Sequence, residues 1–186
     1  FSLSGYDAKE IKDWTNLGEW FQNQILSGRT SLSQSTIGKV NELTSGVTDK
    51  LEKAKIIYQH VQDNTRYISV QVGIGGYQPI EAQEVDELKY GDCKGLSNYT
   101  KALLEVAGVE SYYTHVEAGD AKINFEEDFA SLAQGNHAIL SIPYNDKLYW
   151  IDCTSQTSPF GFLGGFTDDR KVFVMTPDGG KIVKTP

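Results

Sequence analysis

The sequence has little of what marks several classes of protein. It holds two cysteines in 186 residues, too few for a fold built on disulfides. Its apolar runs, such as Ala138-Ile139-Leu140, are only a few residues long, whereas a helix that spans a bilayer needs about 20. Basic residues number 17 against 25 acidic ones, and the net charge is −8. No basic block offers the clustered charge that neutralises phosphates, so we expect neither a nucleic-acid partner nor a membrane span in this segment.

What is present is typical of a globular chain. Apolar residues make up 39%, charged residues 23% and aromatic residues 11%, which excludes collagen-like and fully disordered classes. A length of 186 residues predicts one domain with a sizeable core. The start at Phe1, without a Met or an apolar leader, indicates a processed end or a boundary within a longer protein.

Hydrophobic periodicity divides the chain into helices followed by strands. Apolar residues spaced by three or four positions predict helices over 7–26, 37–46, 48–64 and 93–107, the last closed by Gly108. Alternating patterns and turn residues predict strands over 67–72, 111–116, 136–144, 147–154, 172–175 and 181–184. Helices followed by antiparallel strands favour an α+β fold with the helices on one face of the sheet.

Cys93 lies at the predicted start of a helix, between Gly91 and Gly95. Free amide donors and the helix dipole favour a thiolate there and lower its pKa below the free value of about 8.5. The backbone N–H of the same residue can point at a developing oxyanion. Cys93 is therefore a candidate nucleophile, although free cysteines are often buried structural residues.

A predicted hairpin brings two groups with acid–base chemistry together. Asn145-Asp146 forms its tight turn, and symmetrical pairing about that turn places Asp152 opposite Ile139. Residues 137 and 139 lie on one strand face, so the Asp152 carboxylate should project toward the same side as His137.

These three residues can form a Cys-His-Asp relay. The Asp152 carboxylate would hold the His137 tautomer and stabilise imidazolium, while the other ring nitrogen takes the proton of the Cys93 thiol. The alternative is that His137 is a structural histidine beside a carboxylate in a sheet.

The second cysteine, Cys153, follows Asp152 directly. Strand alternation should turn it to the opposite face, away from Cys93, so we expect a small buried thiol and no disulfide. A zinc site made of Cys93, His137, Asp152 and Cys153 is a further alternative. Its spacing matches no recognised zinc pattern, so we expect no metal and no cofactor.

The motifs around these residues resemble the core of the transglutaminase-like superfamily. They are Tyr90-Gly91-Asp92-Cys93-Lys94-Gly95, Asn136-His137-Ala138 and Tyr149-Trp150-Ile151-Asp152-Cys153-Thr154. The resemblance covers roughly 51–154 and extends to a bacterial, envelope-associated branch in which β-rich domains flank this core. Cys153 is a departure, because proline is common after the aspartate in this family.

The resemblance implies a papain-like, transglutaminase-like fold in which the nucleophile helix packs on an antiparallel sheet. It implies that Cys93 is the nucleophile, His137 the general base and Asp152 its orienting group. The implied reaction is acyl transfer or hydrolysis of a peptide or protein amide through a thioester. A non-catalytic binding or scaffold module of a larger envelope protein is the alternative. The resemblance also implies flanking β-rich domains and a periplasmic or extracellular location.

Residues 1–186 are thus expected to form a single transglutaminase-like domain. It would comprise a helical accessory segment (1–50), a catalytic core (51–154) and a C-terminal β extension (155–186).

Three further residues are candidates for the cleft. Gln71 precedes the nucleophile on a predicted strand and is a candidate second oxyanion donor, or an exposed structural glutamine. Tyr77 and Trp150 could wall the substrate cleft or fill the core. His115 has no acid nearby in the sequence and is expected on the surface or in the core.

Overall fold

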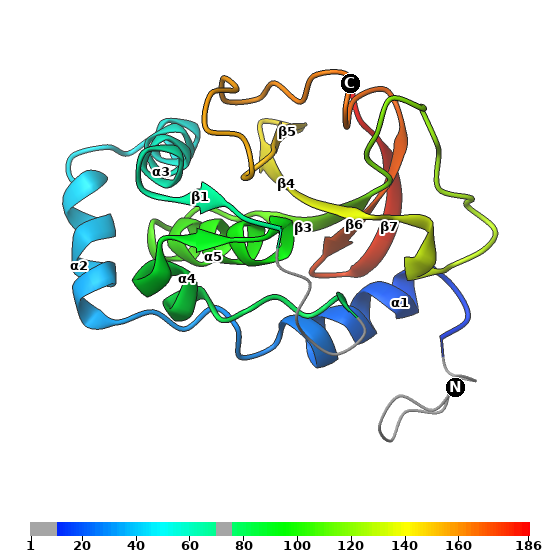
Figure 1. Ribbon diagram of the computed structural model, residues 1–186, viewed down its shortest axis with the longest axis horizontal. Helices are drawn as coiled ribbons and strands as arrows, with labels where there is room; N and C mark the ends of the chain where they lie inside the picture. The colour runs from blue at the N-terminus through cyan, green and yellow to red at the C-terminus, as the bar shows by residue number, and fades with distance from the viewer. Residues whose placement is uncertain (1–10, 70–75) are drawn as a thin grey trace.

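The computed structural model describes residues 11–69 and 76–186 (Figure 1). Its helices are α1 (Trp14–Phe21), the π-helical turn η1 (Gln22–Leu26), α2 (Gln34–Leu43), α3 (Lys50–Asn64), α4 (Ala82–Leu88), α5 (Cys93–Val106) and the 3-10 turn η3 (Leu132–Gln134). Its strands are β1 (Arg66–Tyr67), β2 (Tyr90–Gly91), β3 (Tyr112–Val116), β4 (His137–Tyr144), β5 (Lys147–Ile151), β6 (Lys171–Thr176) and β7 (Gly179–Lys184). None of the helices in these ranges is long and apolar enough to cross a membrane.

Short polar side chains fix where four of the helices begin. In each case the N-cap oxygen accepts a backbone N–H three residues on, which satisfies a donor that the helix itself cannot. The caps are Asp13 for α1, Ser33 for α2, Asp49 for α3 and Asp92 for α5. Gly108, at φ 74°, follows α5 in the left-handed conformation predicted for a C-terminal glycine.

Five strands form one antiparallel sheet in the order β5-β4-β3-β6-β7. The hairpin β4/β5 turns at Asn145 (φ 49°) and Asp146 (φ 60°), the two positive values that a type I′ turn requires. Leu140 pairs with Ile151, which is the predicted symmetrical register. Extended by one residue, this register places Asp152 beside Ile139, at the end of the sheet where His137 begins β4.

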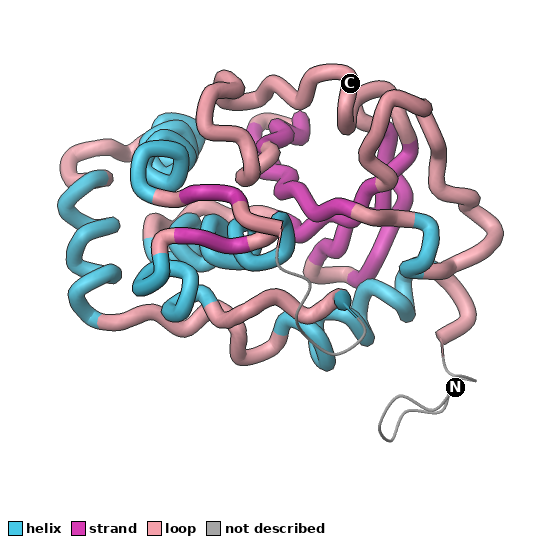
Figure 2. The backbone as a smooth tube through the Cα atoms, viewed as in Figure 1, coloured by secondary structure: helices cyan, strands magenta, loops and turns pink. Residues whose placement is uncertain are grey.

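Helices cover one face of this sheet. Helix α5 packs against β3 and β4, and α1 packs against β6 and β7. Most buried apolar side chains lie between these helices and the sheet. On the opposite face, a smaller cluster contains Val116, Ile139, Trp150, Val172 and Val174. Figure 2 shows the long loops that join β3 to β4 and β5 to β6.

The predicted α+β fold, with the Cys93 helix packed on an antiparallel sheet, is confirmed. Two local predictions differ. Of the strand expected over 67–72, residues 68–69 are not in a strand, and Tyr67 belongs to the two-residue strand Arg66–Tyr67, which pairs in parallel with Tyr90–Gly91; residues 70–72 lie outside the described residues. Helix α4 was not predicted, and its N-cap Glu81 makes no side-chain capping bond that could have signalled it.

Candidate active site

Cys93 is the first residue of α5. Asp92 organises this turn: its Oδ1 accepts the Gly95 N–H at 2.8 Å and its carbonyl oxygen accepts the Leu96 N–H at 2.9 Å. Its other carboxylate oxygen accepts from the Lys94 ammonium group. Within the described ranges the Cys93 N–H has no hydrogen-bond acceptor, so it remains available at the positive end of the helix dipole.

His137 and Asp152 meet at the start of β4 and just beyond the end of β5. The His137 Nε2 lies 2.9 Å from the Asp152 Oδ2, and both residues are buried. The other carboxylate oxygen, Oδ1, accepts from the Thr154 N–H at 2.9 Å and from the Thr154 hydroxyl at 2.6 Å. Because both oxygens are engaged, the carboxylate is held in one orientation toward the imidazole.

The Cys93 thiol completes this series. Burial alone would raise its pKa, but hydrogen bonding to His137, the charge of that ring and the Ala138 backbone together lower it below its ordinary value. Asp92 acts weakly in the opposite direction. The site therefore favours the thiolate, which is the nucleophilic form of cysteine.

The imidazole is shifted in the complementary direction. Burial alone would lower the pKa of His137, yet the hydrogen bonds and charges of Asp152 and Cys93 raise it to about 9. Burial would likewise raise the pKa of Asp152, whereas the bonds from His137 and Thr154 lower it. A thiolate, an imidazolium and a carboxylate thus stabilise one another in sequence.

A cavity of about 230 Å³ opens beside the thiol. It is lined by Phe21, Gly76, Tyr77, Cys93, Lys94, Tyr113, His115, Gly135, Asn136 and His137. His115 forms part of the wall, with its Nε2 3.0 Å from the Leu132 carbonyl oxygen and its ring edge-to-face with Tyr77. Burial lowers the pKa of His115 to about 4, so this ring is neutral at pH 7.

The three site residues lie within a segment that matches a known protein family. A model described as the Transglutaminase-like superfamily matches residues 37–154, more than half of the chain. The chain belongs to the transglutaminase-like superfamily. The match contains Cys93, His137 and Asp152, and it begins at residue 37, before the point at which the predicted core starts.

Two crystal structures have the transglutaminase-like fold of this chain. One is a "putative protease" from Parabacteroides distasonis, with 21% sequence identity and a TM-score of 0.61, covering 87% of this chain and 30% of that one. The other is a "putative cysteine protease" from Cytophaga hutchinsonii, with 13% identity and a TM-score of 0.52, covering 100% of this chain and 54% of that one. The chain thus spans less than a third of the first structure and about half of the second. None of the curated proteins matches it.

The structure brings most of the predicted site residues of this transglutaminase-like chain together. His137 is hydrogen-bonded to Asp152 and lies beside the Cys93 thiol, whose pKa it lowers, and Tyr77 lines the cavity next to them. Gln71 lies outside the described residues. The prediction that Trp150 walls the cleft is wrong, and its alternative, a place in the core, is the one observed. Trp150 belongs to the smaller cluster on the far face, because in β5 it alternates with Ile151, which faces the helices.

Cys153 is free and buried, as predicted. Contrary to the prediction, it does not turn away from the helix that carries Cys93: it packs in the cluster under α5, where its thiol contacts Ser97 and Thr100. Burial raises its pKa to about 12. Among the described residues, no group of three or more histidine, cysteine or acidic side chains is placed to hold a metal ion, so the zinc alternative finds no ligand set there.

Sequence reasoning missed three contributors to the site. The Ala138 N–H and the wall position of His115 follow from strand pairing, which no local pattern reveals. Thr154 had a usable signal, since an aspartate followed two residues later by threonine is typical of an Asx turn.

Proposed function

We propose that this chain is a cysteine-dependent acyltransferase or hydrolase that acts on peptide or side-chain amides through a thioester. The hydrogen-bonded series from Cys93 through His137 to Asp152 carries the proposal. It supplies a nucleophile, a base and an orienting acid beside a cavity that a substrate can enter.

Acylation would begin with attack of the Cys93 thiolate on the amide carbonyl carbon. The carbonyl oxygen takes up negative charge, which the free Cys93 N–H and the α5 dipole stabilise. The carbon–nitrogen bond then breaks, and the leaving amine takes its proton from the His137 imidazolium. The acyl group remains on the Cys93 sulfur as a thioester.

Deacylation would reverse these roles. Water or a primary amine attacks the thioester carbonyl and loses a proton to neutral His137. The carbon–sulfur bond breaks, the thiolate is regenerated, and the product is an acid or a new amide. Asp152 retains its hydrogen bond to Nε2 in both half-reactions and stabilises each imidazolium that forms.

The comparisons support a peptide amide as the substrate class. The chain is transglutaminase-like, and both similar crystal structures carry names that call them proteases. Both are longer than the part that this chain spans, which supports flanking domains in a longer protein. The envelope-associated branch and a periplasmic or extracellular location belong to the same proposal.

Two parallel assays test the proposal. One measures cleavage of a panel of fluorogenic peptide amides, and the other measures incorporation of a fluorescent primary amine into casein. We expect turnover in at least one assay, its loss in Cys93→Ala and its retention in Cys153→Ala, the matched control. Equal signals from the wild type and Cys93→Ala would overturn the proposal and favour a non-catalytic binding or scaffold module.

A further inference from the structure

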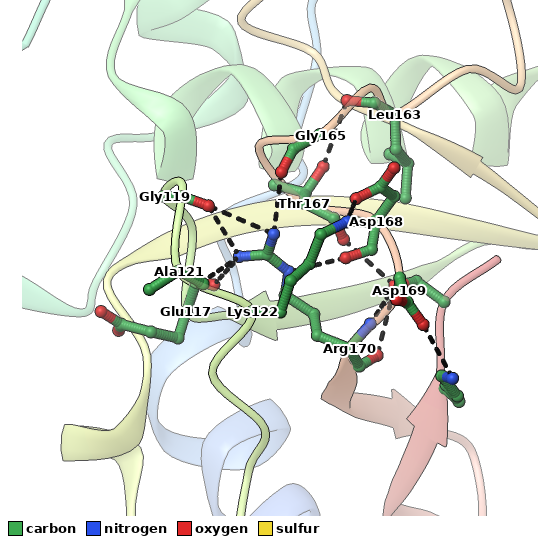
Figure 3. Close-up of polar contacts among 12 residues, drawn as sticks. Glu117, Gly119, Ala121, Lys122, Leu163, Gly165, Thr167, Asp168, Asp169 and Arg170 are labelled. Atoms are coloured by element: carbon green, nitrogen blue, oxygen red, sulfur yellow. Dashed lines mark hydrogen bonds and ion pairs between the residues drawn. The ribbon is translucent and has the colours of Figure 1, made fainter.

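Arg170 is the largest fully buried side chain among the described residues. It stands immediately before β6, and its guanidinium group donates to backbone carbonyl oxygens (Figure 3). Its Nε donates to Asp168 at 2.8 Å, its Nη1 to Glu117 at 2.6 Å and its Nη2 to Gly165 at 2.9 Å. Longer bonds reach the Gly119 and Ala121 carbonyl oxygens.

These acceptors come from two loops, 117–121 after β3 and 161–169 before β6. A buried guanidinium is costly unless its donors are satisfied, so the two loops are held in the arrangement that provides these carbonyl oxygens. The Gly119 N–H also donates to the Phe166 carbonyl oxygen at 2.9 Å, which joins the loops directly.

One of these loops contacts the candidate base, and the other contacts the residue that precedes it. The Phe166 ring lies edge-to-face with the His137 ring, with centroids 5.9 Å apart and planes at 73°. From the other loop, the Ala118 N–H donates to the Asn136 Oδ1 at 2.8 Å, and Asn136 directly precedes His137. Arg170 therefore connects the loop that contacts the His137 imidazole with the loop that holds Asn136, the residue before it.

We propose that Phe166, held in place by Arg170, is a positioning residue for the His137 imidazole. This inference rests on the proposed function, since it gives Phe166 a role through the base. An aromatic ring attracts a cation that lies over its face within about 6 Å of its centroid, and an edge-to-face contact restricts the orientation of both rings. Phe166 is 53% exposed, so its own burial explains little of its placement.

The contact differs from the other influences on His137 because Phe166 carries no charge. The charged and titratable groups that face His137 are Asp152 after β5, Cys93 on α5 and His115 on β3, with the Asp92–Lys94 pair beside Cys93. Replacing Phe166 changes none of these charges, so a change in the titration of His137 reports the loss of the ring, through both its contact with the imidazole and its share in burying it.

The matched pair Phe166→Ala and Phe162→Ala tests this. Phe162 lies in the same loop and is 58% exposed, but it belongs to none of the contacts around His137. NMR titration resolves His137 from the two other histidines, and iodoacetamide alkylation of Cys93 is followed in parallel across pH. We expect Phe166→Ala to shift the pKa of His137 by about half a unit, about threefold in its protonation constant. Phe162→Ala should match the wild type.

A wild-type titration in Phe166→Ala, or an equal shift in Phe162→Ala, would overturn the inference. Hydrogen exchange on the wild-type protein tests the part played by Arg170 without a variant. We expect the Gly119 N–H to be protected as strongly as the amides of β6, and rapid exchange there would contradict the anchoring role. Failure of the proposed function can be told apart from failure of this inference. It would show in the wild-type protein, where Cys93 would react with iodoacetamide no faster than an ordinary exposed cysteine.

Discussion

The His137 Nε2 lies 2.9 Å from the Asp152 Oδ2 in a site where each side chain is only about a tenth exposed, 10% and 11%. Thr154 occupies the other carboxylate oxygen with two hydrogen bonds, so Asp152 cannot turn away without losing them. The imidazole is thereby fixed with its second nitrogen toward the Cys93 thiol. This contact contributes to both the raised pKa of His137 and the lowered pKa of Asp152.

This contact makes stability depend on pH. The raised pKa of His137, about 9, means that its contribution is complete below about pH 6.5 and is lost as the pH rises through about 9. The lowered pKa of Asp152 means that its contribution is present above about pH 4 and is lost as the pH falls further. The pair therefore stabilises the fold most between these two limits.

Asp152→Asn should remove this contribution. We expect it to lower the free energy of unfolding by about 3 kcal/mol near pH 5.5, because it leaves a buried imidazolium without its carboxylate. The loss should shrink toward pH 10, where the imidazole is neutral. Urea denaturation at the two pH values measures it, with the exposed carboxylate of Asp63 changed to Asn as a control. A loss of the same size at both pH values would contradict this account of the pair.

The two cysteines should differ sharply in reactivity. Cys93 borders the cavity and its pKa is lowered, whereas burial raises the pKa of Cys153 to about 12. We expect iodoacetamide at neutral pH to modify Cys93 alone in the native protein and both thiols after denaturation. Peptide mapping by mass spectrometry distinguishes the sites. Modification of native Cys153 at a comparable rate would show that its environment is not the one described here.

Helix α1 approaches β7 closely enough to require glycine. A Cβ added to Gly18 would lie 2.2 Å from the backbone nitrogen of Gly180. We expect Gly18→Ala to destabilise the protein by about 2 kcal/mol or more, because overpacking outweighs the helix propensity gained. Gly38, inside α2, has open space around its Cβ position, and Gly38→Ala should stabilise by about 0.5 to 1 kcal/mol. Chemical denaturation of both variants measures the contrast, and equal effects would argue against the close contact.

Alanine variants of Tyr77 and Trp150 should show the difference between a residue that lines the cavity and one that fills the core. Trp150→Ala is expected to lower stability by about 3 to 5 kcal/mol, because its side chain is buried in the smaller cluster. Tyr77→Ala should lower stability by less than Trp150→Ala does, because Tyr77 is only partly buried, while lowering kcat/KM for a cleaved peptide amide, because Tyr77 lines the cavity. Denaturation curves and steady-state kinetics report the two effects. The reverse pattern would place Trp150 in the cleft.

The geometry of the candidate site was predictable where it depends on local rules. A type I′ turn at Asn145-Asp146 sets the hairpin register, and that register places His137 beside Asp152. The position of Cys93 follows in the same way from the cap provided by Asp92.

What the sequence did not reveal depends on distant parts of the chain. Arg170 lies in a run of four charged residues, Asp168 to Lys171, that is typical of a solvated turn, and only the convergence of two remote loops buries it. The alternation of β5 was readable, but not which face the helices would cover, and this decided the place of Trp150. The pairing of Arg66–Tyr67 with Tyr90–Gly91 likewise joins segments about two dozen positions apart.

The pH dependence of Cys93 alkylation in the native wild-type protein tests the relay most directly. A thiol that shares its proton with His137 should already react fast near pH 6, where an ordinary cysteine of pKa about 8.5 is almost fully protonated. The account predicts a rate that is nearly level from about pH 6 to 8 and that falls at least tenfold at pH 6 in His137→Gln, in which the imidazole is replaced by an amide. A single rise centred near pH 8.5, the same in both proteins, would contradict it.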